Sequence, residues 1–215
     1  MKKMKFTNPV TIVANGNFPT KGIPKNILDK SKSIIACDGA ANLLDEQKYK
    51  IDAIIGDLDS INKKIKDKYL DITHHIQDQS ENDLRKTIEF LISKDVKDAS
   101  IVGATGKRDD HSIGNIFSLT KYSSKINLKI FTETGCFICI NKDTSFKSFK
   151  GQQVSLFTTN DSTKITTNGL KYNFNDSSLS SIFNGTLNES LGNCFNIEID
   201  PGCVLIFLCF ENKYF

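Results

Sequence analysis

The stretch Ile54-Ile55-Gly56-Asp57-Leu58-Asp59-Ser60 is the clearest indication of the fold in this sequence. In it an apolar run ends at a glycine, and two carboxylates follow. The apolar run predicts a buried strand that delivers these acids to the edge of a sheet. In an extended segment, residues two apart point to the same side, so Asp57 and Asp59 are expected to face one ion. Such oxygen ligands suit a hard divalent cation such as Mg²⁺, which often arrives with phosphate. A simple turn is the alternative, because Gly-Asp and Asp-Ser are common after strands.

Similar apolar runs alternate with helical patterns from residue 10 to about residue 135. The runs lie at 10–14, 33–37, 53–55, 72–76, 100–103 and 128–132. The clearest helix is expected over 82–94, where Leu84, Ile88 and Leu91 form an apolar stripe, and a second follows Asp109. This alternation predicts an α/β domain with a mostly parallel sheet and helices on both faces. Ligands of such sheets bind beyond the carboxyl ends of the strands.

The rhythm changes near residue 136. Short runs rich in β-branched and aromatic residues lie at 137–140, 154–158, 164–167, 170–174, 194–199 and 204–210, and turn-rich stretches separate them. We therefore expect an α/β domain over 1–140 and an all-β sandwich domain over 141–215.

Composition narrows the classes of function. The 215 residues are 39% hydrophobic and 25% charged, with a net charge of +3, which gives no reason to expect nucleic acid or a membrane surface as partner. No apolar run approaches the ~20 residues of a membrane span, and we expect a cytoplasmic protein. The six cysteines are expected to be free thiols, since nothing completes a metal site around the CxxC pattern of Cys136 and Cys139.

A second acidic cluster, Asp78-Gln79-Ser80-Glu81-Asn82-Asp83, follows a predicted strand and opens the striped helix. Ser80 and Asp83 fit an [ST]-x-x-[DE] helix N-cap, which gives Asp83 a purely structural reading. At the same sheet edge as Asp57 and Asp59, Asp83 is also a candidate for a third metal carboxylate.

A third cluster spans 103–115. Gly103 and Gly106 let the backbone approach a ligand, and the following helix presents free N–H groups to phosphate. Arg108 offers a forked, permanently charged donor to phosphate oxygens. Asp110 and His111 can orient that arginine, accept hydrogen bonds from a ribose or base, or cap the helix.

With these residues assembled, the chain resembles the thiamine pyrophosphokinase family over nearly all of its length. The motifs that carry the resemblance are those at 37–42 (Cys-Asp-Gly-Ala-Ala-Asn), 56–60, 78–83, 103–115, 169–172 (Gly-Leu-Lys-Tyr) and 185–189 (Gly-Thr-Leu-Asn-Glu). The resemblance implies a nucleotide-binding catalytic α/β domain, a thiamine-binding and dimerising β-sandwich, and a homodimer whose active sites are shared between chains.

The resemblance also assigns roles to matching positions. It implies that Mg²⁺ is held by Asp57, Asp59 and Asp83. It places ATP-binding residues at Asp38, Gln79, Gly103, Gly106, Arg108, Asp110, His111 and Asn115. It places thiamine recognition at Tyr172, Asn188 and Glu189. The chain departs from the family pattern at Asn82 (usually threonine), Lys107 (usually glycine), Tyr172 (commonly tryptophan) and Leu187 (usually serine).

The predicted reaction transfers the pyrophosphoryl group of ATP to the hydroxyethyl oxygen of thiamine, giving thiamine diphosphate and AMP. An aspartate near the metal, Asp78 or Asp83, is expected to accept the hydroxyl proton. One alternative is a non-catalytic sensor of thiamine or nucleotide on the same fold. Another is a nucleotide-sugar transferase that uses Asp57 and Asp59 as its metal site.

Overall fold

The chain is organised as two compact units in the computed structural model, which describes residues 5–210. Unit 1 comprises Met1–Ser118 and Lys125–Glu133, and unit 2 comprises Leu119–Ser124 and Thr134–Phe215. This division falls a few residues before the boundary of 140 that the sequence predicts.

Unit 1 contains the predicted parallel sheet. Its strands are β1 (Val10–Val13), β2 (Ser33–Cys37), β3 (Ala53–Gly56), β4 (Thr73–His75), β5 (Asp98–Val102) and β6 (Asn127–Phe131). They lie in the order β6-β5-β1-β2-β3-β4, and each neighbouring pair is parallel. The apolar run before Asp57 is the buried strand β3, as predicted, and all four of its residues are buried.

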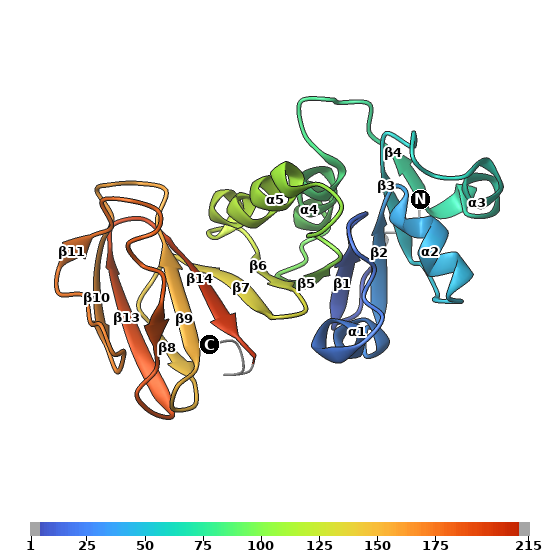
Figure 1. Ribbon diagram of the computed structural model, residues 1–215. Coiled ribbons are helices and arrows are strands. Elements are labelled where there is room, and N and C mark those ends of the chain that lie inside the picture. Colours follow the sequence, from blue (N-terminus) through green and yellow to red (C-terminus); the bar gives the residue numbers. More distant parts are fainter. Residues whose placement is uncertain (1–4, 211–215) are drawn as a thin grey trace. The chain divides into compact units, whose positions relative to one another are not determined.

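Helices cover both faces of this sheet, as predicted. They are α1 (Gly22–Asp29), α2 (Ala40–Glu46), α3 (Lys63–Lys68), α4 (Asp83–Ser93) and α5 (Asp109–Tyr122), with a 3₁₀ turn at Leu70–Ile72. Leu28 of α1 and Leu44 of α2 share one apolar cluster with Val13 and Ile54 of the sheet. Figure 1 shows α4 and α5 on the other side of β1, β2 and β3 from α2. A 3.3 Å contact between the Thr87 hydroxyl and the Cys37 thiol ties α4 to β2.

The start of α4 differs from the predicted N-cap. Asn82, not Ser80, caps the helix, because the helix begins at Asp83 and the Asn82 side chain accepts a hydrogen bond from the Arg85 N–H at 3.0 Å. Asparagine is among the strongest N-cap residues, and its oxygen reaches an N–H that the helix itself leaves unpaired. The Ser80–Asp83 capping prediction is therefore wrong, and the Asp83 carboxylate takes no part in capping the helix.

Over residues 134–210, unit 2 contains β-strands and no helix, which confirms the predicted class, and its other segment contains the end of α5. In one antiparallel set the strands have the order β12-β9-β14-β7, and a second set forms a four-stranded sheet with the order β11-β10-β13-β8. Their strands are β7 (Gly135–Ile140), β8 (Thr144–Lys147), β9 (Gln153–Phe157), β10 (Lys164–Asn168), β11 (Ser177–Ser178), β12 (Asn188–Glu189), β13 (Cys194–Asp200) and β14 (Val204–Cys209). Leu156 and Ile206 of the first sheet share a core with Phe195 and Ile197 of the second, which is the packing of a sandwich.

The expected strand at 170–174 does not form. Only an isolated bridge joins Leu170 to Ser190. Gly169 has a φ of 90°, and the Asn173 side chain accepts a hydrogen bond from the Leu170 N–H at 3.2 Å, so the segment bends. Asparagine closes local turns of this kind, and here it outweighs the β propensity of the surrounding residues.

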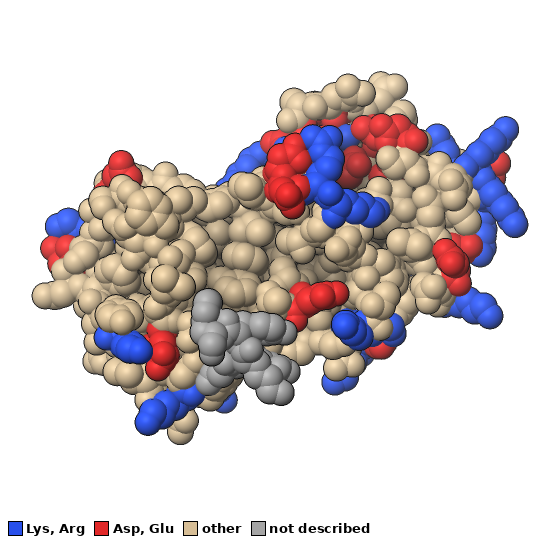
Figure 2. Space-filling model, viewed as in Figure 1, with Lys and Arg blue, Asp and Glu red and all other residues tan. Residues whose placement is uncertain are grey.

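Two further features bear on earlier expectations. Among the described residues, no helix combines the length and the apolar character needed to cross a membrane. On the face seen in Figure 2, acidic and basic side chains of unit 1 lie next to one another, in keeping with the small net charge of +3.

Candidate active site

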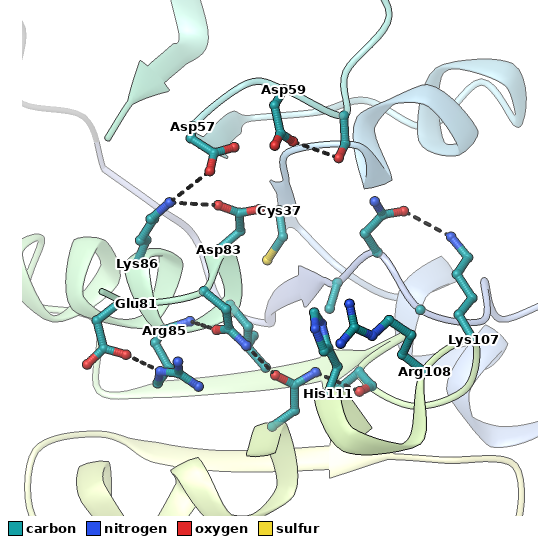
Figure 3. Close-up of a pocket in the computed structure, with 18 of the residues that line it drawn as sticks. Cys37, Asp57, Asp59, Glu81, Asp83, Arg85, Lys86, Lys107, Arg108 and His111 are labelled. Carbon is teal, nitrogen blue, oxygen red and sulfur yellow. Dashed lines mark hydrogen bonds and ion pairs between the residues drawn. The ribbon is translucent and has the colours of Figure 1, made fainter. Parts of the chain in front are cut away.

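A cavity of about 720 Å³ opens in unit 1 beyond the carboxyl ends of its strands. It is lined by residues that follow β1, β3 and β5 and by the first turns of α4 and α5. Figure 3 shows acidic side chains on one side of this cavity and the basic side chains of Lys107 and Arg108 on another. This is the sheet edge at which the sequence predicts ligand binding.

Three carboxylates converge at this edge. Asp38, Asp57 and Asp59 each offer an oxygen within 4.8 Å of the others. Asp38 follows β2 and the other two follow β3, its parallel neighbour, so the register of the sheet brings the acids together. The segment is not extended as predicted, because Leu58 has a φ of 65°. Asp57 and Asp59 reach one site through this left-handed turn instead of through strand alternation.

Burial leaves two of these carboxylates incompletely satisfied. Asp38 is 1% exposed, and its Oδ2 accepts a hydrogen bond from the Ser60 N–H at 2.9 Å. Burial raises the pKa of Asp38 to about 6, and the negative charge of Asp83 adds to that shift. Among the described residues, Asp38 Oδ1 and Asp57 Oδ1 are buried without a hydrogen-bond partner. Orphaned carboxylate oxygens converging on one point are suitable ligands for a divalent cation.

Asp83 lies beside this cluster and is paired with a lysine. Lys86 Nζ lies 3.2 Å from Asp83 Oδ1 and 3.5 Å from Asp57 Oδ2 (Figure 3). Burial raises the pKa of Asp83, although the hydrogen bond from Lys86 opposes the shift. Burial acts to lower the pKa of Lys86, but the hydrogen bond to Asp83 and the charges of both aspartates outweigh it, so the pKa is raised. Lys86 therefore carries its charge.

Gly56 allows this crowding. A Cβ at Gly56 would lie 2.7 Å from Asp38 Cβ and 3.0 Å from Asp83 Oδ1. No real side chain tolerates the shorter distance without displacement of the backbone or the acids. Gly56, which ends the apolar run of β3, is thus the residue that lets carboxylates after two strands and on a helix meet.

The glycine-rich loop after β5 reaches the cavity in left-handed conformations. Gly103 and Gly106 have φ values of 68° and 83°. Lys107, where the family usually has a glycine, also adopts a positive φ of 58°. Its Nζ donates to Asn15 Oδ1 at 3.1 Å, which joins this loop to the one that follows β1.

Arg108 and Asp110 are exposed partners at the start of α5. The Arg108 guanidinium donates from Nε and Nη2 to the two Asp110 oxygens at 3.1 and 2.5 Å. Arg108 and His111 line the cavity, whereas Asp110 orients the arginine from outside it. Asn115 lines the cavity and also braces it, because its amide donates to Ala104 O at 2.8 Å and accepts from Asn82 Nδ2 at 2.8 Å.

The remaining predicted residues of unit 1 separate into two groups. Gln79 lines the cavity. Asp78 does not, and its Oδ1 instead accepts a hydrogen bond from the Ser80 N–H at 2.8 Å in a local turn. Sequence reasoning missed Lys86, whose signal was its position three residues after Asp83 on the same helical face.

The predicted thiamine residues lie together in unit 2. Asn188 is 2% exposed, and its amide donates to Tyr172 O at 2.7 Å and accepts from Tyr172 N–H at 3.1 Å and from Glu189 N–H at 2.9 Å. Tyr172 and Leu187 are 60% and 70% exposed. Glu189 pairs with Lys171 at 3.5 Å. Asn188 therefore fixes the backbone of Tyr172 from a buried position.

A parallel α/β unit with a carboxylate-lined cavity at its strand ends defines a nucleotide-handling enzyme, here combined with an all-β second unit. Two family models cover these parts: residues 24–132 match the model described as "Thiamin pyrophosphokinase, catalytic domain", and residues 135–207 match "Thiamin pyrophosphokinase, substrate-binding domain". The chain belongs to the thiamin pyrophosphokinase family, as its motifs predict.

Individual relatives agree with the family models. The chain is 26% identical over 183 residues to thiamine pyrophosphokinase 1 of Oryza sativa subsp. japonica, covering 71% of this chain and 69% of that protein. It is 31% identical over 107 residues to thiamin pyrophosphokinase 1 of Caenorhabditis elegans, covering 46% and 44%. Its fold matches thiamine pyrophosphokinase from Bacillus subtilis, with a TM-score of 0.78, 20% identity and coverage of 94% and 99%. It also matches the enzyme from Candida albicans, with a TM-score of 0.76, 16% identity and coverage of 94% and 89%.

Proposed function

We propose that this chain transfers the pyrophosphoryl group of ATP to thiamine, giving thiamine diphosphate and AMP. Membership of the family supports the reaction, and the cavity supports its location in unit 1. The observation that carries the proposal is the convergence of Asp38, Asp57 and Asp59 at the strand ends, with two buried carboxylate oxygens left unpaired. A sensor that only binds its ligand has no need of such a site.

Mg²⁺ is the proposed cofactor, held by Asp57 and Asp59 together with Asp38 or Asp83. The donor set fits, since all four residues offer hard carboxylate oxygens. When bound, the ion neutralises charge on the polyphosphate and aligns it for attack. Asp38, first assigned to nucleotide binding, fits the metal better, because it lies in the 4.8 Å cluster.

The ATP polyphosphate is proposed to lie against the loop after β5. Gly103 and Gly106 allow close backbone approach, and the α5 N-terminus favours negative charge. Arg108 is pre-oriented by Asp110 and contributes a forked donor to phosphate oxygens. Gln79 and His111 contact the nucleotide from the cavity wall, and Asn115 acts by holding the loop at Ala104.

Asp83 is the proposed acceptor of the thiamine hydroxyl proton. It lines the cavity, whereas Asp78 does not. Its raised pKa, caused first by burial, makes it a better base than an exposed aspartate. The attacking hydroxyethyl oxygen then forms its bond to the β-phosphorus as the bond to the AMP oxygen breaks.

Thiamine is proposed to bind against Tyr172 and Glu189, with Asn188 as the residue that positions Tyr172. An aromatic face and a carboxylate both suit the cationic thiazolium.

We further propose a homodimer with shared active sites. Exposed apolar side chains of unit 2, namely Ile182, Phe183, Leu187 and Leu191, support a covering partner. The cytoplasmic location remains a prediction from the sequence.

One assay tests the reaction. The protein is incubated with Mg²⁺, ATP and thiamine, and the products are separated chromatographically. AMP and thiamine diphosphate in equal amounts are expected. ADP with thiamine monophosphate would mean that a single phosphoryl group is transferred, and binding without product would favour the sensor.

A further inference from the structure

Lys86 is the most deeply buried charged residue that lines the cavity. It is not part of any of the predicted motifs. Its side chain is 3% exposed, yet it borders the cavity (Figure 3). Lysine is almost never this buried unless it is paired, because desolvating an ammonium ion costs several kcal/mol. Its two carboxylate partners, Asp83 and Asp57, account for its stability at this position.

The first turn of α4 holds the ammonium in place. Lys86 lies three residues after Asp83, so both side chains occupy the same face of the helix. The next residue, Thr87, donates from its hydroxyl to Asp83 O at 2.7 Å and contacts the Cys37 thiol of β2. Helix and strand are thereby joined at this turn, and the ammonium is fixed at the end of β3.

The ammonium has spare capacity for a further acceptor. A lysine carries three N–H donors. Within residues 5–210, its Nζ has two acceptors, at 3.2 Å and at a long 3.5 Å. Asp57 in turn keeps one oxygen, Oδ1, buried and unpaired. One ammonium thus donates to two carboxylates. Among the described residues, the ammonium keeps an unused N–H, and Asp57 keeps an unpaired oxygen.

We propose that Lys86 is a further catalytic residue of this site, bridging Asp57 and Asp83 in the nucleotide-free enzyme and contacting the polyphosphate when nucleotide and divalent cation are bound. The inference rests on the proposed function. A carboxylate oxygen cannot fully serve an ammonium and a divalent cation at once, so the two cations compete for Asp57 and Asp83. The ammonium displaced from the carboxylates is then free to donate to the anionic phosphate.

Competition between the ammonium and the divalent cation predicts that loss of the ammonium has opposite effects on metal binding and on turnover. In Lys86→Met, Mn²⁺ is expected to bind the nucleotide-free protein about tenfold more tightly, because the positive charge beside both carboxylates no longer competes with the ion. In the same variant, turnover is expected to fall about 10²-fold, since one donor to the developing phosphate charge is lost. A lysine that only balances charge for folding would not produce the loss of turnover in a protein that remains folded.

The test is calorimetric titration of Mn²⁺ into wild type, Lys86→Met, Lys86→Arg and the control Lys94→Met, followed by product assays. Lys94 caps the other end of α4, so its variant removes a lysine of the same helix outside the cavity. Wild-type Mn²⁺ affinity is expected in Lys94→Met, and Lys86→Arg is expected to restore part of the lost turnover. If Lys86→Met fails to fold, Lys86→Gln removes the charge while keeping a donor.

Each outcome decides between the claims. Unchanged or weaker Mn²⁺ binding in a folded Lys86→Met protein would overturn the competition, and wild-type turnover in that variant would overturn the phosphate contact. If wild type itself forms no thiamine diphosphate, the proposed function fails, and the Mn²⁺ titrations still decide whether the ammonium and the cation compete.

Discussion

The two regions that carry the predicted site residues are built on opposite plans. In unit 1, Asp38 is 1% exposed and Lys86 is nearly as buried, so charges are held at strand ends out of water. In unit 2, Tyr172 and Leu187 are 60% and 70% exposed, and the buried residue beneath them, Asn188, is neutral. Unit 1 thus holds charged groups close together at its strand ends, whereas unit 2 carries its predicted site residues on an exposed surface.

The comparison predicts that changes in unit 1 act mainly on turnover and changes in unit 2 mainly on acceptor binding. Substitutions in each unit test this division between turnover and acceptor binding, each beside a control substitution in the same chain.

The largest effect is expected for Asp57→Asn. Loss of a metal carboxylate should lower turnover by about 10³-fold at saturating Mg²⁺. The midpoint of thermal unfolding should change little, because relief of the repulsion among Asp38, Asp57 and Asp59 offsets the loss of the 3.5 Å ion pair to Lys86. Initial rates and thermal unfolding are measured beside Asp67→Asn, an exposed aspartate of α3. Intact turnover in Asp57→Asn would rule out the metal assignment.

Gly56→Ala tests whether the packing of the acids matters as much as their presence. The added Cβ would meet Asp38 Cβ at 2.7 Å and Asp83 Oδ1 at 3.0 Å, so the carboxylates must move apart. A misplacement of this size is expected to lower kcat/KM by about 10²-fold. The control is Gly114→Ala in α5, where a Cβ meets nothing within 4 Å and the free energy of unfolding should rise by about 1 kcal/mol. Equal rates in the two variants would contradict the close-packed model.

These two variants also show what the sequence could and could not predict. The parallel sheet, the edge that binds ligand and the acids after β3 follow from apolar periodicity and order along the chain. The left-handed turn at Leu58, the N-cap at Asn82 and the ion pair between Lys86 and Asp57, which are 29 residues apart, depend on local backbone geometry and tertiary contacts that periodicity does not describe. Asp78 and Asn115 illustrate the same limit, since Asp78 is held in a local turn and Asn115 bonds to Asn82 and Ala104 on other segments.

Asn188→Ala tests whether unit 2 acts on binding of the acceptor. It removes the amide that pairs with both backbone groups of Tyr172, so the KM for thiamine should rise about tenfold, equivalent to about 1.4 kcal/mol. The KM for ATP should stay within about twofold of wild type, because among the described residues the hydrogen bonds of Asn188 go to Tyr172 and Glu189 and to no residue that lines the cavity of unit 1. Kinetics are compared with Asn193→Ala, an exposed asparagine of the same unit. A parallel rise in both KM values would show that the units do not divide the work in this way.

The smallest effect is expected at Leu187, where the exposed face of unit 2 carries local strain. Leucine at a φ of 61° costs about 1–2 kcal/mol, a cost that glycine avoids. Glycine loses about 0.5–1 kcal/mol of backbone entropy on folding, so Leu187→Gly should stabilise the protein by only about 0.5 kcal/mol. Leu191→Gly is the matched control, because Leu191 is also exposed but lacks a positive φ, and it should destabilise. Urea unfolding of both variants measures the difference. If both lose stability equally, the left-handed turn at Leu187 stores no strain. If Leu187→Gly gains stability while thiamine binding weakens, the strain is retained because the leucine side chain contacts the acceptor, and the exposed face of unit 2 is then a binding surface in its own right.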